Sequence, residues 1–242
     1  MNMNQTVLAV IGISILMSLP VARVVAQAPP TPDQMVAALK QNLAESQKRL
    51  RQYEWTETTA ISLKGEEKSR KQQRVYYGAD GKLTKLPLGG PPAPAAQSGG
   101  RRGGRVKEQV IENKKNDMQE YMEKAAALIQ RYVPPDPAQI QKAKDAGQMQ
   151  VHPQPEGKVR VEFRNYVQPN DQMSIDVDAK AALLSGLSVA TYLEKPEDTV
   201  TLNVRFATLA DGTSYTAQTA LEAKAKNIRV VVENSGHRPL AR

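Results

Sequence analysis

The sequence predicts an α+β protein in which helices pack on an antiparallel β-sheet. Two amphipathic helical segments occupy much of the N-terminal half of the chain. From residue 159 onward, short segments with apolar residues at every second position follow one another, separated by short turns. The 242 residues include no cysteine. Disulfides, thiolate metal sites and cysteine nucleophiles are therefore excluded, and packing and hydrogen bonds must hold the fold together.

The first helix is expected over residues 33–52. Thr31 or Asp33 can cap it, and Pro32 suits the first helical position if Thr31 is the cap. Its apolar side chains recur at helical spacing, whereas the other face is polar. One stripe should therefore be buried against the sheet, formed by Met35, Val36, Leu39, Leu43 and Leu50.

Residues 53–88 predict three strands joined by tight turns. Between Tyr53 and Leu63, aromatic and β-branched residues alternate with polar ones, which indicates a strand with one face in the core. We expect the first turn at Gly65-Glu66. The second is expected at Asp80-Gly81, because Asp-Gly tolerates the positive φ angles of tight hairpins. A polar strand should lie between these turns and a short strand, residues 83–88, after them.

Residues 89–105 are rich in Gly, Pro and Arg and predict a flexible loop within the domain. A helical cover is expected over residues 106–147. Its strongest part carries one apolar face, and Pro134-Pro135 ends the first helix. Asp136 can then cap a short second helix that ends near Gly147. The apolar face consists of Met118, Tyr121, Met122, Ala125, Leu128, Ile129 and Tyr132.

The remaining strands predict an antiparallel meander, because the loops between consecutive strands are short. Turns are expected at residues 196–198 and at Asp211-Gly212. Residues 33–240 should thus form a single domain. The predicted strands are centred on residues 159–164, 175–178, 187–193, 200–206, 215–221 and 228–232.

Residues 1–26 are typical of a secretory signal peptide. An apolar run from Val7 to Leu19 is followed by Pro20, and Val24-Val25-Ala26 places short side chains before the expected cleavage point. The run is shorter than the about 20 residues that span a membrane. We expect export to the periplasm of a diderm bacterium, an extended leader at residues 27–32 and a freely soluble mature protein. The alternative is an uncleaved N-terminal anchor.

The chain is basic, with a formal net charge of +8. Cleavage of the signal peptide would remove one positive charge, Arg23, and leave +7. Such a surface attracts anionic membranes, acidic polysaccharide or nucleic acid, although a solvated basic surface needs no partner. Residues 101–105 resemble an RGG segment, which can bind RNA. Export makes RNA a poor partner, so we expect the loop to contact anionic lipid or envelope polymer, or to have no function.

Several short motifs resemble the LolA/LolB superfamily of periplasmic lipoprotein carriers and their uncharacterised exported relatives. They are Tyr53-Glu54-Trp55 at the start of a strand, residues 200–206 (VTLNVRF), residues 209–213 (LADGT) and residues 228–234 (IRVVVEN). The resemblance covers most of residues 32–238. It implies a strongly curved sheet that forms an incomplete barrel, helices on its open side and a cavity for acyl chains. The chain resembles an uncharacterised relative more than the carrier itself.

One face of the strands, together with two methionines of the helical cover, is the candidate lining of a ligand cavity. Methionine suits irregular apolar ligands because its side chain is flexible and polarizable. The same residues could instead form a closely packed core, and the sequence leaves both interpretations open. The candidates are Trp55, Ile61, Met118, Met122, Val161, Phe163, Val200, Leu202, Val204, Phe206, Ile228, Val230 and Val232.

No residue pattern predicts a catalytic or metal site, and no cofactor is expected. The only histidines, His152 and His237, lack further ligands at zinc spacing and are expected at the surface. Asp176 and Asp178 share a strand face, where paired carboxylates could cleave glycosides, but solvated charges are the commoner case. Glu57 should point toward the core face, where it could pair with a Lys or Arg or lie at a rim.

Two function classes follow from these features. The first is a periplasmic, non-catalytic binding protein for a lipophilic or acylated envelope molecule, with a lipid or an acylated protein as its partner. The alternative is a protein-interaction or envelope-stress sensor module with a filled core, because the periplasmic regulator of the sigma-E pathway shares the fold that the resemblance implies. A hydrolase is a weaker third possibility. Nucleic acid is not an expected partner, and the oligomeric state is not predicted.

Overall fold

The computed structural model describes residues 32–89 and 104–240, with side chains described for residues 34–89 and 116–240. The predicted signal peptide, most of the leader and most of the Gly/Pro/Arg-rich loop lie outside these residues.

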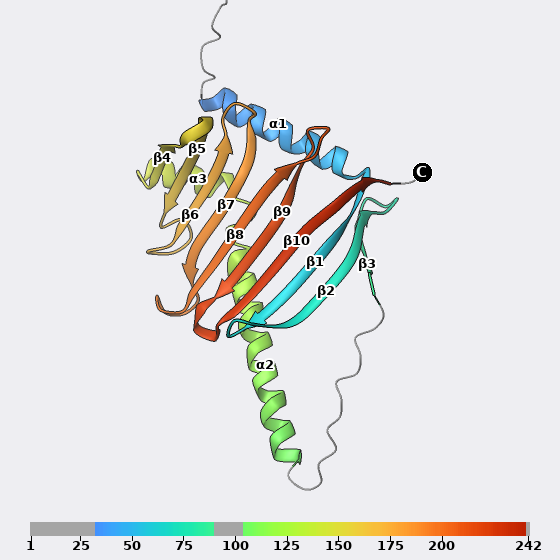
Figure 1. Ribbon diagram of the computed structural model, residues 1–242. Coiled ribbons are helices and arrows are strands. Elements are labelled where there is room, and N and C mark those ends of the chain that lie inside the picture. The colour runs from blue at the N-terminus through green and yellow to red at the C-terminus, as the bar shows by residue number, and fades with distance from the viewer. Residues whose placement is uncertain (1–31, 90–103, 241–242) are drawn as a thin grey trace, which may run out of the picture.

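Ten strands form one sheet in which every neighbouring pair is antiparallel (Figure 1). The spatial order is β3-β2-β1-β10-β9-β8-β7-β6-β5-β4, so β3 and β4 are the two edges and the sheet is not closed. This open antiparallel sheet is consistent with the expected half-barrel. The strands are β1 Tyr53–Leu63, β2 Glu66–Tyr77, β3 Leu83–Pro87, β4 Met149–Pro153, β5 Lys158–Arg164, β6 Gln172–Asp178, β7 Leu183–Tyr192, β8 Thr199–Thr208, β9 Ser214–Ala223 and β10 Ile228–Pro239.

Two features of the sheet were not apparent from the sequence. The N-terminal hairpin joins the meander because β1 pairs with β10, with Ile61 opposite Val230 and Leu63 opposite Ile228. The edge strand β4 was also missed, because it is only five residues long and carries few apolar side chains. It pairs with β5, and its Met149 lies opposite Phe163.

The register separates an apolar inner face of the sheet from a polar outer face. Residues directly opposite each other in neighbouring strands share a face. The outer face carries exposed ion pairs such as Arg160–Asp176 (2.7 Å) and Arg229–Glu222 (3.2 Å). The inner face carries one apolar row that crosses eight strands in turn: Ile61, Val230, Leu221, Leu202, Val189, Met173, Phe163 and Met149.

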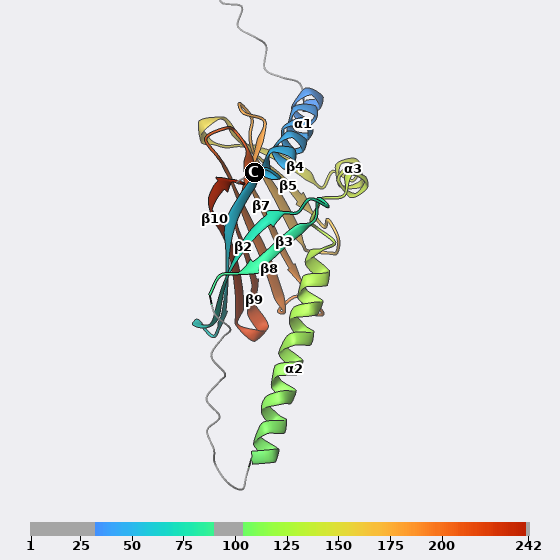
Figure 2. The ribbon, with the colours of Figure 1, turned by 90° about the vertical axis from the view of Figure 1, so that its right-hand side faces the viewer.

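The three helices lie on one side of the sheet in Figure 2. They are α1 Pro32–Leu50, α2 Gly104–Ile129 and α3 Pro137–Asp145. The predicted cap of α3 is confirmed, because the Asp136 side chain accepts a hydrogen bond of 2.8 Å from the N–H of Ala138.

Polar side chains fasten α1 to turns at one end of the sheet. Asn42 Nδ2 donates to the carbonyls of Ala181 and Ala182, at 3.1 and 3.0 Å, and buried Ser46 accepts from the N–H of Ser214 at 3.1 Å. Part of the stripe that was expected to be buried is not. Val36 is 50% exposed and Leu43 is 42% exposed, because α1 lies along the ends of the strands (Figure 1) instead of across their inner face.

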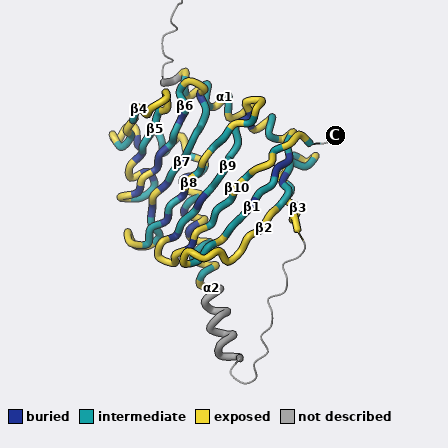
Figure 3. The backbone as a smooth tube through the Cα atoms, viewed as in Figure 1, coloured by how far each residue is buried: buried dark blue, intermediate teal, exposed yellow. Residues whose placement is uncertain are grey.

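The packed core occupies the half of the inner face formed by β5 to β8. Here side chains from the C-terminal part of α2 and from α3 pack with those of the strands. Figure 3 shows buried positions, in dark blue, along these strands. Core packing of this kind holds the strands in place, because each buried large side chain contributes about 1.5–3 kcal/mol. The buried cluster comprises Leu128, Tyr132, Ala143, Phe163, Tyr166, Met173, Leu187, Val189 and Leu202.

A buried carboxylate organises the loop between β5 and β6. Asp171 is 2% exposed and accepts hydrogen bonds from the N–H groups of Tyr166, Val167 and Gln168. It also accepts from the hydroxyl of Tyr132, which follows α2. Burial, together with the hydrogen bond to Asp171, raises the pKa of the Tyr132 phenol. One side chain thereby ties the helical segment to the loop and satisfies backbone donors that would otherwise be buried without a partner.

We predict that Asp171→Asn lowers the free energy of unfolding by about 2–3 kcal/mol, because an amide group would replace an acceptor that faces several donors. Urea denaturation followed by circular dichroism would show a lower midpoint with an unchanged slope. The control is Asp145→Asn at the exposed end of α3, which should shift the free energy by less than about 0.5 kcal/mol. Equal effects of the two changes would contradict this role for Asp171.

Candidate functional site

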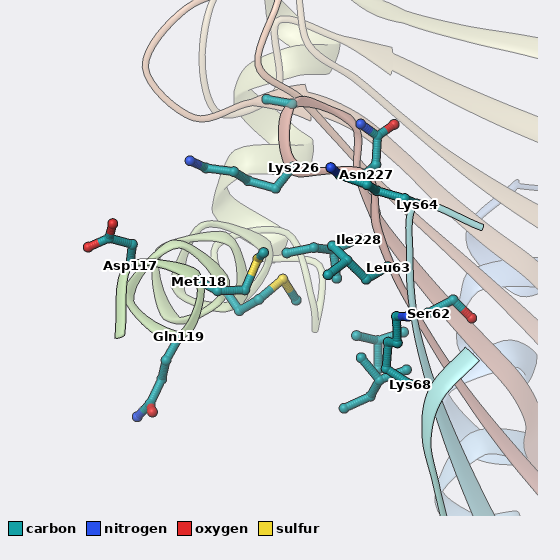
Figure 4. Close-up of a pocket in the computed structure, with 14 residues that line it drawn as sticks. Ser62, Leu63, Lys64, Lys68, Asp117, Met118, Gln119, Lys226, Asn227 and Ile228 are labelled. Atoms are coloured by element: carbon teal, nitrogen blue, oxygen red, sulfur yellow. The ribbon is translucent and has the colours of Figure 1, made fainter. Parts of the chain in front are cut away.

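Away from the packed core, the inner face is open where β1 ends and β10 begins. A cavity of about 920 Å³ lies there between the sheet and α2. Ile61, Leu63, Ile228 and Val230 of the sheet line its floor, and Met118 and Met122 of α2 also line it. Figure 4 shows Met118 pointing from the helix toward Leu63 and Ile228. The volume falls in the range of about 300–1,000 Å³ that is usual for ligand pockets. We call this space the methionine groove.

The groove exists because α2 meets the sheet only along its C-terminal part. Ala125 and Leu128 are buried, whereas Met122 and Met118, about one and two turns before Ala125, are only half-buried. The hydroxyl of Tyr121 donates a hydrogen bond to the Asp198 carboxylate and fixes the position of α2 beside the groove. Burial and this hydrogen bond raise the pKa of the Tyr121 phenol. The floor below remains accessible, and Ile61 is 39% exposed.

The thirteen predicted lining residues divide between the groove and other places. Ile61, Met118, Met122, Ile228 and Val230 line the groove. Val232 lies opposite Thr59 on the same inner face, in the row next to Ile61 and Val230. The others lie elsewhere: Phe163 and Leu202 in the packed core, Val161, Val204 and Phe206 against it, Val200 fully buried on β8, and Trp55 near the opposite end of β1.

The sequence did not indicate the turn residues at the mouth of the groove. Leu63 continues the alternation that had already identified Ile61, so the pattern could have found it. Lys64 and Asn227 are far apart in the chain, yet the N–H of Lys64 donates to the Asn227 carbonyl at 2.8 Å. This contact requires the pairing of β1 with β10. The remaining lining residues are Ser62, Lys68, Asp117, Gln119, Ala225 and Lys226.

Trp55 belongs to an aromatic cluster with His237 instead of the groove. Its ring stacks on the His237 imidazole with centroids 5.5 Å apart, and Tyr215 contacts the same imidazole at 4.0 Å. The indole Nε1 donates to Asn234 at 3.0 Å. Trp55 and Ile61 are six residues apart on one strand, which corresponds to about 20 Å. His237 is half-buried, contrary to the expected surface position, and burial lowers its pKa.

The carboxylates considered as catalytic candidates are engaged in structural interactions. Asp176 forms two hydrogen bonds with Arg160, and Asp178 accepts from the backbone N–H groups of the following turn, at 2.9 and 3.0 Å. Glu57 accepts two hydrogen bonds from Lys85, at 2.7 and 2.8 Å, which corresponds to one of the two positions considered for it, pairing with a basic residue.

Metal ligands do not gather anywhere in the described part of the chain: no three His, Asp or Glu side chains there are placed to share an ion. Within the same residues, no helix has the length and apolar character to cross a membrane.

No protein-family model and no curated protein matches the chain. Among solved structures, the chain is similar to a DUF1329 family protein from Desulfovibrio piger, with 15% identity and a TM-score of 0.40 over 85% of this chain and 92% of that one. It is also similar to a LolA superfamily protein from Nitrosomonas europaea, with 7% identity and a TM-score of 0.36 over 84% and 94% of the two chains.

A third similar structure is that of MucB in complex with MucA(peri), with 12% identity and a TM-score of 0.20 over 85% of this chain and 99% of that one. At TM-scores of 0.40 or less, none of these likenesses indicates what the chain binds.

We predict that the aromatic cluster makes stability depend on pH. Because the pKa of His237 is lowered in the folded protein, the unfolded chain takes up a proton first as the pH falls below about 6.5. The free energy of unfolding should therefore decrease as the pH falls from that value toward the folded-state pKa. His237→Phe, which keeps the ring contacts, should reduce this decrease in urea titrations at about pH 7 and about pH 5.

The matched control is His152→Gln, which changes the other histidine and leaves the cluster intact. If the pH dependence disappears in this variant and persists in His237→Phe, the assignment to His237 is wrong.

Proposed function

We propose that this chain is an exported, non-catalytic binding protein that holds the acyl chain of a lipophilic or acylated molecule in the methionine groove. The observation that carries the proposal is the partly exposed apolar surface of Ile61, Leu63 and Val230, which lines one cavity with two methionines of α2. Residues 1–26 have the pattern of a signal peptide, which favours the periplasm as the place of action.

Apolar transfer supplies the binding energy in this proposal. Moving apolar surface from water into the groove contributes about 25 cal/mol per Å² buried, and no covalent step is involved. The two methionines can adjust to chains of different shape, because the thioether side chain has several rotatable bonds and is polarizable. Backbone pairing between β1 and β10 fixes the floor of the groove. The methionine side chains of α2 are therefore the part of the groove that adjusts to the ligand.

The distribution of packing favours a carrier over an interaction module with a filled core. Around Phe163 and Leu202 the inner face is packed by α2 and α3, which gives a rigid frame. Around Ile61 and Val230 the same apolar row continues but remains partly exposed. Native proteins seldom leave apolar surface open without a partner, and a concave apolar site with few polar groups is typical of ligand binding.

We predict that Met118→Glu with Met122→Glu weakens the binding of monopalmitoylglycerol by roughly tenfold or more. Binding would place an unpaired carboxylate against the acyl chain, and leaving a buried polar group unsatisfied costs about 1–3 kcal/mol. Titration calorimetry or displacement of a fluorescent acyl probe would measure the dissociation constant on protein freed of lipid. Circular dichroism would establish that the variant is folded.

The control is Ala126→Glu with Ala127→Glu, two exposed positions on the same helix that do not line the groove. This variant should bind as the parent protein does. The proposal fails if the parent binds no acyl probe and carries no lipid in native mass spectrometry of a periplasmic extract. It also fails if both variants bind equally well.

A further inference from the structure

We propose that the natural ligand is an anionic lipid, bound as a monomer with its head group at a lysine rim formed by Lys64, Lys71 and Lys226. This inference rests on the proposed function, because it assumes that an acyl chain occupies the methionine groove. It adds the chemical class of the ligand and the residues that select it.

Chain pairing brings the rim together from distant parts of the sequence. Lys64 lies in the turn after β1, and Lys226 lies in the turn between β9 and β10. The hydrogen bond from the Lys64 N–H to the Asn227 carbonyl, 2.8 Å long, holds the two turns side by side. Both lysines line the groove, and Figure 4 shows the Lys226 side chain extending from its turn toward α2.

Lys71 extends the rim along β2. It lies opposite Thr59, which in turn lies opposite Val232, so all three are on the inner face. This row is directly next to the row of Ile61 and Val230 on the groove floor. The three lysines therefore border the apolar floor on the β2 side and at its end, and all three are exposed.

The carboxylates near the groove pair with other lysines and do not neutralise the positive charge of this rim. Glu57 is held by Lys85 and Glu66 forms an ion pair with Lys68. Among residues 34–89 and 116–240, Lys64, Lys71 and Lys226 have no carboxylate within ion-pairing distance. Asp117 on α2 is the single acidic side chain that lines the groove in this part of the chain. Lys226 instead lies over the ring of Tyr121, 5.7 Å from its centroid.

Charge and shape together favour an anionic lipid. A free anion would satisfy the lysines but leave Ile61 and Val230 exposed to water. An uncharged acyl compound would cover the floor but leave the ammonium groups along its border without a counter-ion. A molecule with both parts uses the whole site, and the aliphatic stems of the lysines can extend the apolar border toward the head group. Attraction of opposite charges also increases the rate of capture.

The experiment compares three probes with the same acyl chain on lipid-free protein. They are palmitoyl-lysophosphatidylglycerol, which is anionic, palmitoyl-lysophosphatidylcholine, which is zwitterionic, and uncharged monopalmitoylglycerol. We expect the anionic probe to bind roughly tenfold more tightly than the other two, because each exposed charge pair adds only a modest contribution to binding. Higher salt should reduce this preference, because it screens exposed charges.

The triple variant Lys64→Gln, Lys71→Gln, Lys226→Gln should lose the preference while still binding the uncharged probe. Its matched control removes three exposed lysines that do not line the groove, Lys40→Gln on α1 and Lys142→Gln and Lys144→Gln on α3, so the net charge is the same. That control should keep the preference. Loss of the preference in both variants would assign it to overall charge and overturn the rim.

The remaining outcomes separate the rim from the proposed function. If all three probes bind the parent protein equally, the rim is wrong and acyl binding stands. If none binds, the proposed function is wrong and the rim fails with it. If the protein binds vesicles of phosphatidylglycerol but no monomeric probe, the lysines contact a membrane surface, and the inference of a monomeric ligand is overturned.

Discussion

The pairing of β1 with β10 is the constraint on which the rest of the site depends. It joins an N-terminal hairpin to the last strand of the meander and places Ile61 beside Val230 and Leu63 beside Ile228. Without it, the apolar row of the inner face would end at β10. The same pairing brings two turns together that are more than 150 residues apart, and with them the lysines at the mouth of the groove.

The inner face combines a filled half with an open half, and the course of α2 separates them. Leu128 and the following Tyr132 enter the core between the helical segment and β5 to β8, where Asp171 fixes the adjoining loop. Met118 lies nearer the N-terminal end of α2, where it lines the groove and is only half-buried. A helix held firmly at one end can leave space at the other, because the packed core already supplies the contacts that hold the fold together.

Charged side chains follow the same division of the sheet. On the outer face, cross-strand pairs such as Arg160–Asp176 alternate in sign and face water, as expected for the solvated side of an antiparallel sheet. On the inner face, Glu57 forms an ion pair with Lys85. Lys71 lies beside an apolar row and forms no ion pair with a carboxylate among the described residues. An unbalanced positive rim beside an apolar floor is the pattern that an amphiphilic anion would complement.

The sequence by itself determined the local elements. Alternation predicted β1 from Tyr53 to Leu63, helical spacing predicted the apolar face of α2, and Asp136 marked the start of α3. Period-two spacing also identified the face of each strand, so Ile61, Ile228 and Val230 were correctly grouped with Phe163 and Leu202. Only the tertiary structure decided which of them are packed and which are open, because that depends on where α2 leaves the sheet. The sequence could not predict the lysine rim either. Strand pairing, and not a local pattern, decides which charged residues of distant turns lie next to one another.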